Sequence, residues 1–218
     1  MRFKLPNTSL TTRSVPHKLE TEQDLISYYN DRISTYGPSV EAVQWQSQYT
    51  QYKRYQVILN HLNKSSKTLC DVGCGCGDFF HYVTLNQYPI DYHGIDISAN
   101  MIVQAQRTYP KGHFQCLTIE DLLPNHTYDT IIASGIMNLR LNNQTTYITT
   151  LIKNMLTLSK KQVIFNILSE KAKRFSRSKT FIYYSKSHVT AILDSLQIRY
   201  KIIEDYLPND MTIILEKE

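Results

Sequence analysis

The stretch Leu69-Cys70-Asp71-Val72-Gly73-Cys74-Gly75-Cys76-Gly77-Asp78 decides the fold. A short apolar run from Thr68 to Val72 breaks into a loop with glycine at every second position. Apolar residues follow Asp78, which we expect to cap a helix. Glycines let the backbone approach a ligand closely and adopt dihedral angles that a Cβ atom disfavours. A strand that turns into a helix through such a loop predicts a nucleotide-binding cradle.

The spacing and charge of this loop narrow the type of ligand. The pattern G-x-G-x-G differs from the G-x-G-x-x-G of dinucleotide-binding proteins. Asp71 comes two residues before the first glycine, where a carboxylate does not help to bind a pyrophosphate but attracts a ligand with an ammonium and a sulfonium. The segment from Asp71 to Gly77 resembles motif I of class I S-adenosylmethionine-dependent methyltransferases. A glycine-rich turn without a ligand is the alternative for this segment taken alone.

The composition is that of a globular chain. It has 218 residues, of which 42% are hydrophobic and 20% charged, enough for one domain with a sizeable core. The formal net charge of +5 does not by itself imply a nucleic-acid partner. The N-terminus lacks an apolar signal segment and no stretch approaches the length of a membrane span, so we expect a cytoplasmic protein without a membrane partner.

Three of the four cysteines, Cys70, Cys74 and Cys76, crowd the glycine loop, and the fourth is Cys116. Their spacing, C-x3-C-x-C, has no nearby partner at the spacing of a zinc site. We therefore expect small, reduced cysteines in a cytosolic protein and no metal site.

The chain divides into two predicted parts. Residues 1–47 are expected to form a loose N-terminal arm and lid helices, and residues 48–218 a Rossmann-like domain. One helix is expected from Thr21 to about Ile33. A second helical stretch is expected from near Ser39 to Leu62, with Val40, Val43, Trp45 and Tyr49 spaced for one face.

From Thr68 onward, strands and helices alternate at the lengths of β-α units, which predicts a doubly wound α/β fold with a mainly parallel sheet. The strands are expected near residues 68–72, 92–97, 113–118, 128–133, 162–167, 197–205 and 211–216. The family resemblance implies seven strands with an antiparallel last strand.

Ligands of open α/β sheets bind at the carboxyl ends of the strands. Asp96, 23 positions after Gly73, follows the second strand and is expected to bind the two ribose hydroxyls, with a solvated strand-end aspartate as the alternative. The resemblance places Ile97 and Ile119 around the adenine ring. The predicted cofactor-binding residues are Tyr49, Arg54, Asp71, Gly73, Cys74, Gly75, Asp96, Ile97, Met101, Ile119, Glu120, Asp121, Ser134 and Gly135.

Two sets of residues could serve structural roles instead of binding the cofactor. Glu120 or Asp121 is expected to accept a hydrogen bond from the adenine amino group, but capping of a helix fits them nearly as well. The pattern Trp45-x3-Tyr49-x4-Arg54 resembles the helix before motif I in small-molecule methyltransferases, in which an aromatic residue and an arginine reach the methionine part of the cofactor. Core packing of the two aromatic residues and a surface salt bridge of the arginine are the alternatives.

The segment Ser134-Gly135-Ile136-Met137-Asn138 resembles motif IV of the family. It lacks the Asp/Asn-Pro-Pro-aromatic sequence of amino methyltransferases of DNA and the Pro-Cys pair of cytosine C5 chemistry, which favours a small-molecule acceptor. A general base is needed only if the nucleophile arrives protonated. The candidates near the predicted pocket are Tyr28, Asn138, Asn166 and Tyr184, of which the asparagines can only orient.

A basic segment follows the fifth predicted strand. It carries Lys171, Lys173, Arg174, Arg177 and Lys179. A basic lid suggests an anionic substrate or a phosphate backbone, and a solvated loop is the alternative. We therefore expect a methyltransferase that moves the methyl group of S-adenosylmethionine to a small, anionic acceptor and releases S-adenosylhomocysteine. An RNA methyltransferase that holds phosphates with residues 171–179 is the second hypothesis, and a binding or scaffold protein is the third.

Overall fold

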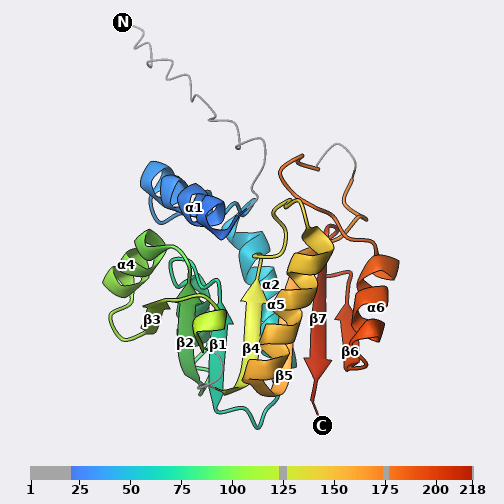
Figure 1. Cartoon of the computed structure of the whole chain (residues 1–218). Coiled ribbons are helices and arrows are strands. Elements are labelled where there is room, and N and C mark those ends of the chain that lie inside the picture. Colours follow the sequence, from blue (N-terminus) through green and yellow to red (C-terminus); the bar gives the residue numbers. More distant parts are fainter. Residues whose placement is uncertain (1–20, 123–126, 174–176, 218) are drawn as a thin grey trace, which may run out of the picture.

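Within the residues that the structure describes, which are 21–122, 127–173 and 177–217, seven strands form one sheet. Figure 1 shows this sheet in a computed structural model of the chain. The spatial order is β3-β2-β1-β4-β5-β7-β6. The strands are β1 (Thr68–Val72), β2 (Asp91–Asp96), β3 (His113–Cys116), β4 (Tyr128–Ser134), β5 (Ser159–Leu168), β6 (Arg199–Ile203) and β7 (Asp210–Glu216).

The direction of the strands confirms the predicted fold class. The pairs β1–β2, β1–β4, β2–β3 and β4–β5 are parallel, whereas β7 is antiparallel to both β5 and β6. The strand order reverses between β1 and β4, because β2 and β3 lie on one side of β1 and β5 on the other side of β4. A reversal of this kind is where α/β sheets bind ligands.

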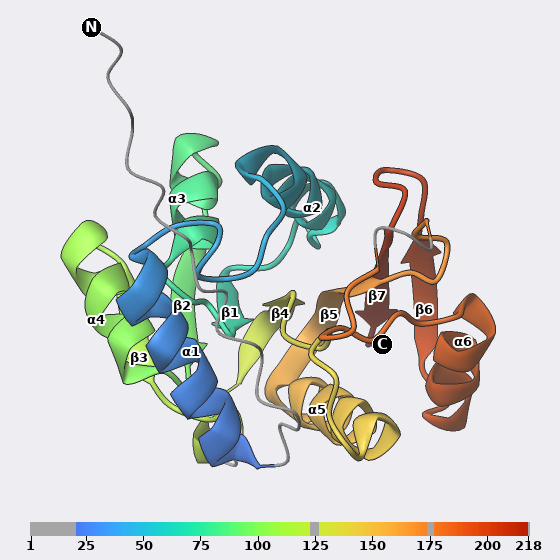
Figure 2. The same ribbon diagram turned by 90° about the horizontal axis from the view of Figure 1, so that it is seen from above.

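Helices cover both faces of the sheet (Figure 2). One apolar cluster joins α2, α3 and α4 to the sheet, and another joins α5 and α6 to its other face. Helix α1 lies across the carboxyl ends of the strands (Figures 1 and 2). The helices are α1 (Glu22–Tyr36), α2 (Gln48–His61), α3 (Asp78–Leu85), α4 (Ala99–Thr108), α5 (Gln144–Leu158) and α6 (Lys186–Ser195), and η1 (Glu120–Leu122) is a 3-10 turn.

The second predicted helix was wrong over its first third. Residues 40–44 form turns, and α2 begins only after Ser47, whose hydroxyl accepts a hydrogen bond from the backbone N–H of Thr50. Gln44 has a φ of 61°, a left-handed conformation that no α-helix contains. Trp45 therefore belongs to residues 37–47, which we call the α1–α2 loop, and not to the helix that carries Tyr49.

Other strand ends differ from the predicted ones by a few residues. Strand β3 ends at Cys116 rather than Thr118, β6 is shorter than expected, and β5 extends beyond its predicted range at both ends. Thr118 instead belongs to the turn before η1, because its hydroxyl and backbone N–H both bond to the Asp121 carboxylate.

Helix α1 is tied to the sheet domain by side-chain contacts. The Ser98 hydroxyl, at the start of α4, donates a hydrogen bond of 2.7 Å to the Asn30 side chain. Arg32 donates to the backbone oxygen of Ala42 at 2.9 Å, which fixes the α1–α2 loop against α1. The predicted division at residue 47 stays a prediction, and residues 1–20 lie outside the described part.

In the described ranges, no helix combines the length and the apolar character that a membrane span requires.

Candidate active site

A cavity of about 420 Å³ lies at the carboxyl ends of β1, β2 and β4, below α1 and the α1–α2 loop. Its β2 side is formed by the glycine loop and the end of β2, and its β4 side by the end of β4 and Trp45. The predicted site residues that line it are Asp71, Gly73, Cys74, Gly75, Asp96, Ile97, Met101, Ile119, Glu120, Ser134 and Gly135. The structure thus brings together most of the residues proposed for the cofactor.

The glycine loop is fixed by its backbone. The N–H groups of Gly73 and Cys74 both donate to the carbonyl oxygen of Ile95 in β2, at 2.8 and 3.0 Å. Gly73 has a φ of 75°, and a Cβ atom there would lie 2.2 Å from a methyl group of Ile136. Glycine is therefore required at this position by both conformation and space.

Asp71 presents a buried carboxylate beside this loop. It is 2% exposed, and the Tyr92 hydroxyl donates a hydrogen bond of 2.6 Å to it. Burial raises the pKa of Asp71 to about 7, since the Tyr92 hydrogen bond offsets only part of the desolvation and the Asp96 and Asp78 carboxylates oppose a further negative charge. A cationic ligand group would stabilise the ionised form.

Asp96 joins the glycine loop to the start of α4. Its two carboxylate oxygens accept hydrogen bonds from the backbone N–H groups of Gly75, at 2.9 Å, and Ser98, at 2.8 Å. Burial raises its pKa, and these two hydrogen bonds counteract the rise. Each carboxylate oxygen has a further lone pair, so Asp96 can still accept hydrogen bonds from a diol.

Only some of the residues proposed for the adenine ring line the cavity. Ile97, Ile119 and Glu120 line the cavity, whereas Asp121 does not. The Asp121 carboxylate accepts hydrogen bonds from the backbone and hydroxyl of Thr118, and these bonds lower its pKa. For Asp121 the geometry therefore matches the capping alternative.

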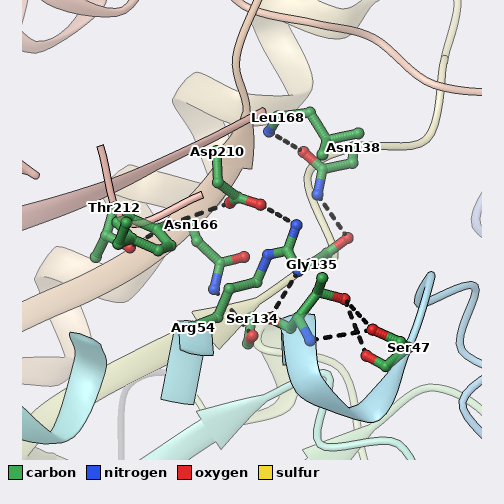
Figure 3. Close-up of polar contacts among 11 residues, drawn as sticks. Ser47, Arg54, Ser134, Gly135, Asn138, Asn166, Leu168, Asp210 and Thr212 are labelled. Atoms are coloured by element: carbon green, nitrogen blue, oxygen red, sulfur yellow. Dashed lines mark hydrogen bonds and ion pairs between the residues drawn. The ribbon is translucent and has the colours of Figure 1, made fainter. Parts of the chain in front are cut away.

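The three residues of the upstream pattern also have different surroundings. Trp45 lines the cavity, but Tyr49 is 66% exposed and lies outside it. Arg54 does not line the cavity either, and its guanidinium forms an ion pair with Asp210 (Figure 3). Arg54 and Asp210 are 4% and 3% exposed, so this pair is buried, unlike the surface salt bridge considered from the sequence.

None of the four candidate general bases lines the cavity. Asn138 bridges two strand ends, because it accepts a hydrogen bond from the backbone of Leu168 at 2.8 Å and donates to the oxygen of Gly135 at 3.3 Å (Figure 3). Asn166 donates to the Ser134 hydroxyl at 2.9 Å. These two asparagines thus bond to Gly135 and Ser134, which line the cavity, without lining it themselves.

The two tyrosines among the candidates have structural partners. The Tyr184 hydroxyl donates to the oxygen of Met137 at 2.9 Å, and burial raises its pKa. Tyr28 is buried and packs against Leu139, and burial raises its pKa as well. In these positions neither hydroxyl contacts the cavity.

Sequence reasoning missed much of the lining, above all the residues from α1 and α5. Leu25 and Tyr29 lie one turn apart on α1, a spacing that could have marked a face toward a ligand. The lining residues that were not proposed are Thr21, Glu22, Leu25, Tyr29, Val43, Gln51, Tyr55, Val72, Asp78, Phe79, Ile95, Leu117, Thr118, Ile136, Leu141, Tyr147, Thr150 and Leu151.

The lining has one sign of charge. Its acidic residues are Glu22, Asp71, Asp78, Asp96 and Glu120, and no lysine, arginine or histidine of the described ranges lines it. Buried carboxylates without a cationic neighbour favour a positively charged ligand. These carboxylates therefore fit a ligand with ammonium and sulfonium groups.

The described residues of the basic segment lie outside this cavity. Lys171 pairs with Glu204 at 2.9 Å, and Arg177 donates to the backbone oxygen of Ala172 at 3.0 Å. Arg174 lies outside the described residues. Cys70, Cys74 and Cys76 are buried and Cys116 is exposed, all as free thiols.

Comparison with known families identifies the class of this fold and site. A family described as "Methyltransferase domain" matches residues 63–204, more than half of the chain. The chain therefore belongs to this family of methyltransferase domains.

Two curated relatives carry corresponding names. "Putative methyltransferase Rv1506c" of Mycobacterium tuberculosis is 27% identical over 158 residues, which cover 67% of this chain and 91% of the relative. "Putative methyltransferase 235L" of Invertebrate iridescent virus 6 is 29% identical over 98 residues, 44% of this chain. The match spans only 37% of the viral protein.

Solved structures share the fold. Magnesium protoporphyrin IX methyltransferase from Synechocystis PCC 6803 with bound SAH has a TM-score of 0.63 at 16% identity, covering 91% of this chain and 100% of that chain. The DhpI-SAM-HEP complex has a TM-score of 0.66 at 15% identity, covering 88% and 95%. The plantazolicin methyltransferase BpumL in complex with SAH has a TM-score of 0.63 at 14% identity, covering 90% and 97%.

Proposed function

We propose that this chain binds S-adenosylmethionine and transfers its methyl group to a small-molecule acceptor, releasing S-adenosylhomocysteine. The observation that carries the proposal is the glycine loop with Asp71 and Asp96 at the edge of an acidic cavity. The family match and the solved relatives crystallised with SAM or SAH support the same cofactor.

The cofactor would supply a methyl group activated by the positive charge on its sulfonium. Asp71, held by Tyr92, would bind the ammonium, and Asp96 would bind the ribose hydroxyls. The glycine loop lets the backbone come close to the ligand. The main work of the protein is to hold the nucleophile in line with the methyl group, and a general base is needed only if the nucleophile arrives protonated.

Helix α1 and the α1–α2 loop would exclude water during transfer. Leu25, Tyr29 and Val43 line the cavity from that side and are mostly apolar. A general base remains unassigned, because the four candidates from the sequence lie outside the lining.

The volume of the cavity, about 420 Å³, supports a small acceptor, because a bound cofactor would occupy much of it. The anionic character of the acceptor is a hypothesis that rests on the basic segment in the sequence. Lys171 and Arg177 of that segment are engaged with protein groups and do not line the cavity. No structural observation favours RNA over a small molecule.

The proposal is tested by thermal unfolding with S-adenosylmethionine and S-adenosylhomocysteine. We expect affinities near the micromolar range, and a stabilisation of about 2.7 kcal/mol when the ligand exceeds its dissociation constant a hundredfold. An unchanged melting temperature at millimolar concentrations of both ligands would refute the proposal. Mass analysis of labelled products in a metabolite extract then identifies the acceptor.

A further inference from the structure

The α1–α2 loop crosses both sides of the cavity by packing on two glycines. A Cβ atom on Gly75 would meet Val43 at 3.4 Å, and a Cβ atom on Gly135 would meet the six-membered ring of Trp45 at 2.9 and 3.0 Å. Both glycines have a left-handed φ, of 54° and 89°. Val43 thus closes over the β2 side, and the Trp45 indole lies directly on the backbone that follows β4.

Arg54 also packs over the Trp45 ring. The guanidinium carbon lies 4.4 Å from the ring centroid, which is a cation–π distance. The backbone N–H of Trp45 donates to the oxygen of Val40 at 2.8 Å, so the main chain at this residue is anchored as well. Trp45 is therefore held between a glycine backbone, a cation and a turn.

Arg54 itself is held in place by its own helix and by Asp210, near the end of the chain. It pairs with Asp210, the first residue of β7, and donates to the oxygen of Thr50 at 3.0 Å (Figure 3). Asp210 also accepts a hydrogen bond of 3.2 Å from the Tyr206 hydroxyl. Arg54 is not among the residues that line the cavity, so its guanidinium is not placed to bind a carboxylate there.

We propose that Trp45 is the specificity-determining wall of the β4 side, where the acceptor enters, and that Arg54 is a positioning residue which holds Trp45 through its ion pair with Asp210. The inference rests on the proposed function. It replaces the expectation that Arg54 binds the carboxylate of the cofactor. Trp45 contacts the end of β4, across the strand-order reversal from the glycine loop, so its shape bounds the β4 side of the shared cavity.

The chain offers a direct probe, because Trp45 is its single tryptophan. In Arg54→Lys and Asp210→Asn, we expect the emission of Trp45 to shift to longer wavelength and its quenching by acrylamide to rise about twofold or more. The dissociation constant of S-adenosylhomocysteine should stay within about twofold. Lys53→Gln, which removes a charge from an exposed neighbour on the same helix, is the matched control and should change neither quantity.

Trp45→Ala tests the wall without touching the ion pair. Incubated with labelled S-adenosylmethionine and the small-metabolite fraction of an extract, it should form the wild-type product at least tenfold more slowly and methylate bulkier compounds. Trp45→Phe should restore most of the wild-type profile. S-adenosylhomocysteine affinity, measured by calorimetry, should change less than the rate of product formation in Trp45→Ala and stay within about twofold in Trp45→Phe.

Three results would overturn the inference. The first is a loss of S-adenosylhomocysteine affinity of tenfold or more in Arg54→Lys with unchanged Trp45 quenching, which would make Arg54 a cofactor ligand. The second is an unchanged product profile in Trp45→Ala. The third is unchanged emission and quenching in both ion-pair variants. Failure of the wild-type protein to bind S-adenosylhomocysteine would instead refute the proposed function, and the quenching experiment needs no ligand.

Discussion

The two sides of the cavity are built by different means. On the β2 side, backbone N–H groups hold the glycine loop, with Gly73 donating to the Ile95 carbonyl and Gly75 to the Asp96 carboxylate. On the β4 side, the wall is a side chain, Trp45, whose position depends on Arg54 and on Asp210 from the last strand. A backbone cradle suits a ligand common to a family, whereas a wall made of side chains can change with the acceptor.

The difference predicts that substitutions on the β2 side abolish ligand binding, while those on the β4 side change which acceptor is used. Gly73→Ala is the strongest test of the prediction that substitutions on the β2 side abolish ligand binding. A Cβ atom with a left-handed φ, placed 2.2 Å from Ile136, should lower the free energy of unfolding by about 2–4 kcal/mol and abolish S-adenosylhomocysteine binding. Chemical denaturation and calorimetry measure both effects.

Gly37→Ala is the matched control for Gly73→Ala. Its φ of 62° is also positive, with a ψ of −168°, but no atom lies within 4 Å of the added Cβ. It should cost only the backbone strain, about 1–3 kcal/mol, and leave ligand affinity unchanged. If both variants lost equal stability and both still bound S-adenosylhomocysteine, the close approach at Gly73 would have no functional meaning.

Asp96→Ala should weaken S-adenosylhomocysteine binding by about 1–3 kcal/mol, through lost hydrogen bonds to the ribose and a loosened link between Gly75 and Ser98. Calorimetric titration measures the change. The adenine-side variant Asp121→Ala is the control, because its carboxylate caps a turn outside the cavity. Equal affinities in wild type and Asp96→Ala would reduce Asp96 to a loop-fixing residue.

The same contrast explains what the sequence could predict. The sheet and the glycine loop follow from hydrophobic periodicity and glycine spacing, which are local properties. The fold prediction was confirmed, and the residues proposed around Asp71 and Asp96 meet at one cavity. Their roles in binding stay predictions.

The parts that were missed depend on long-range contacts. The partner of Arg54 is Asp210, far along the chain, and no local pattern links the two. Gln44 adopts a left-handed turn although glutamine carries no turn signal, so the apolar spacing from Val40 to Tyr49 was read as one helix. Helix α1 covers the cavity through tertiary packing on α4, which amphipathic spacing alone does not specify.

The titration of Asp71 gives a pH test of the β2 side. Its pKa is raised from 3.8 to about 7, so its contribution to stability is present below pH 4 and is lost as the pH rises through 7. A bound ammonium favours the ionised carboxylate, and binding therefore releases a proton below pH 7. We expect the affinity for S-adenosylhomocysteine to rise about tenfold between pH 6 and pH 8.

Asp71→Asn separates this effect from other titrations. The variant should bind S-adenosylhomocysteine more weakly and with a nearly flat pH dependence, since the amide does not ionise. Calorimetry in buffers of different ionisation enthalpy counts the released protons. A tenfold rise that persists in Asp71→Asn would assign the titration to another group.

The smallest expected effect concerns the extent of the β4 side, and whether it includes the basic segment. Lys171 and Lys186 both pair with Glu204, and both side chains are largely exposed, but only Lys171 belongs to the segment. If an anionic acceptor is steered by this segment, Lys171→Ser should raise the KM for the acceptor and flatten its salt dependence, whereas Lys186→Ser should not. Since Lys171 lies outside the cavity and exposed pairs contribute little, we expect both variants to stay within about twofold of wild type at low and high salt.

The kinetics are measured with the acceptor found in the metabolite extract. A selective effect of Lys171→Ser would extend the acceptor side to the loop after β5. Equal kinetics would confine acceptor selection to the wall formed by Trp45 and remove the argument for an anionic acceptor.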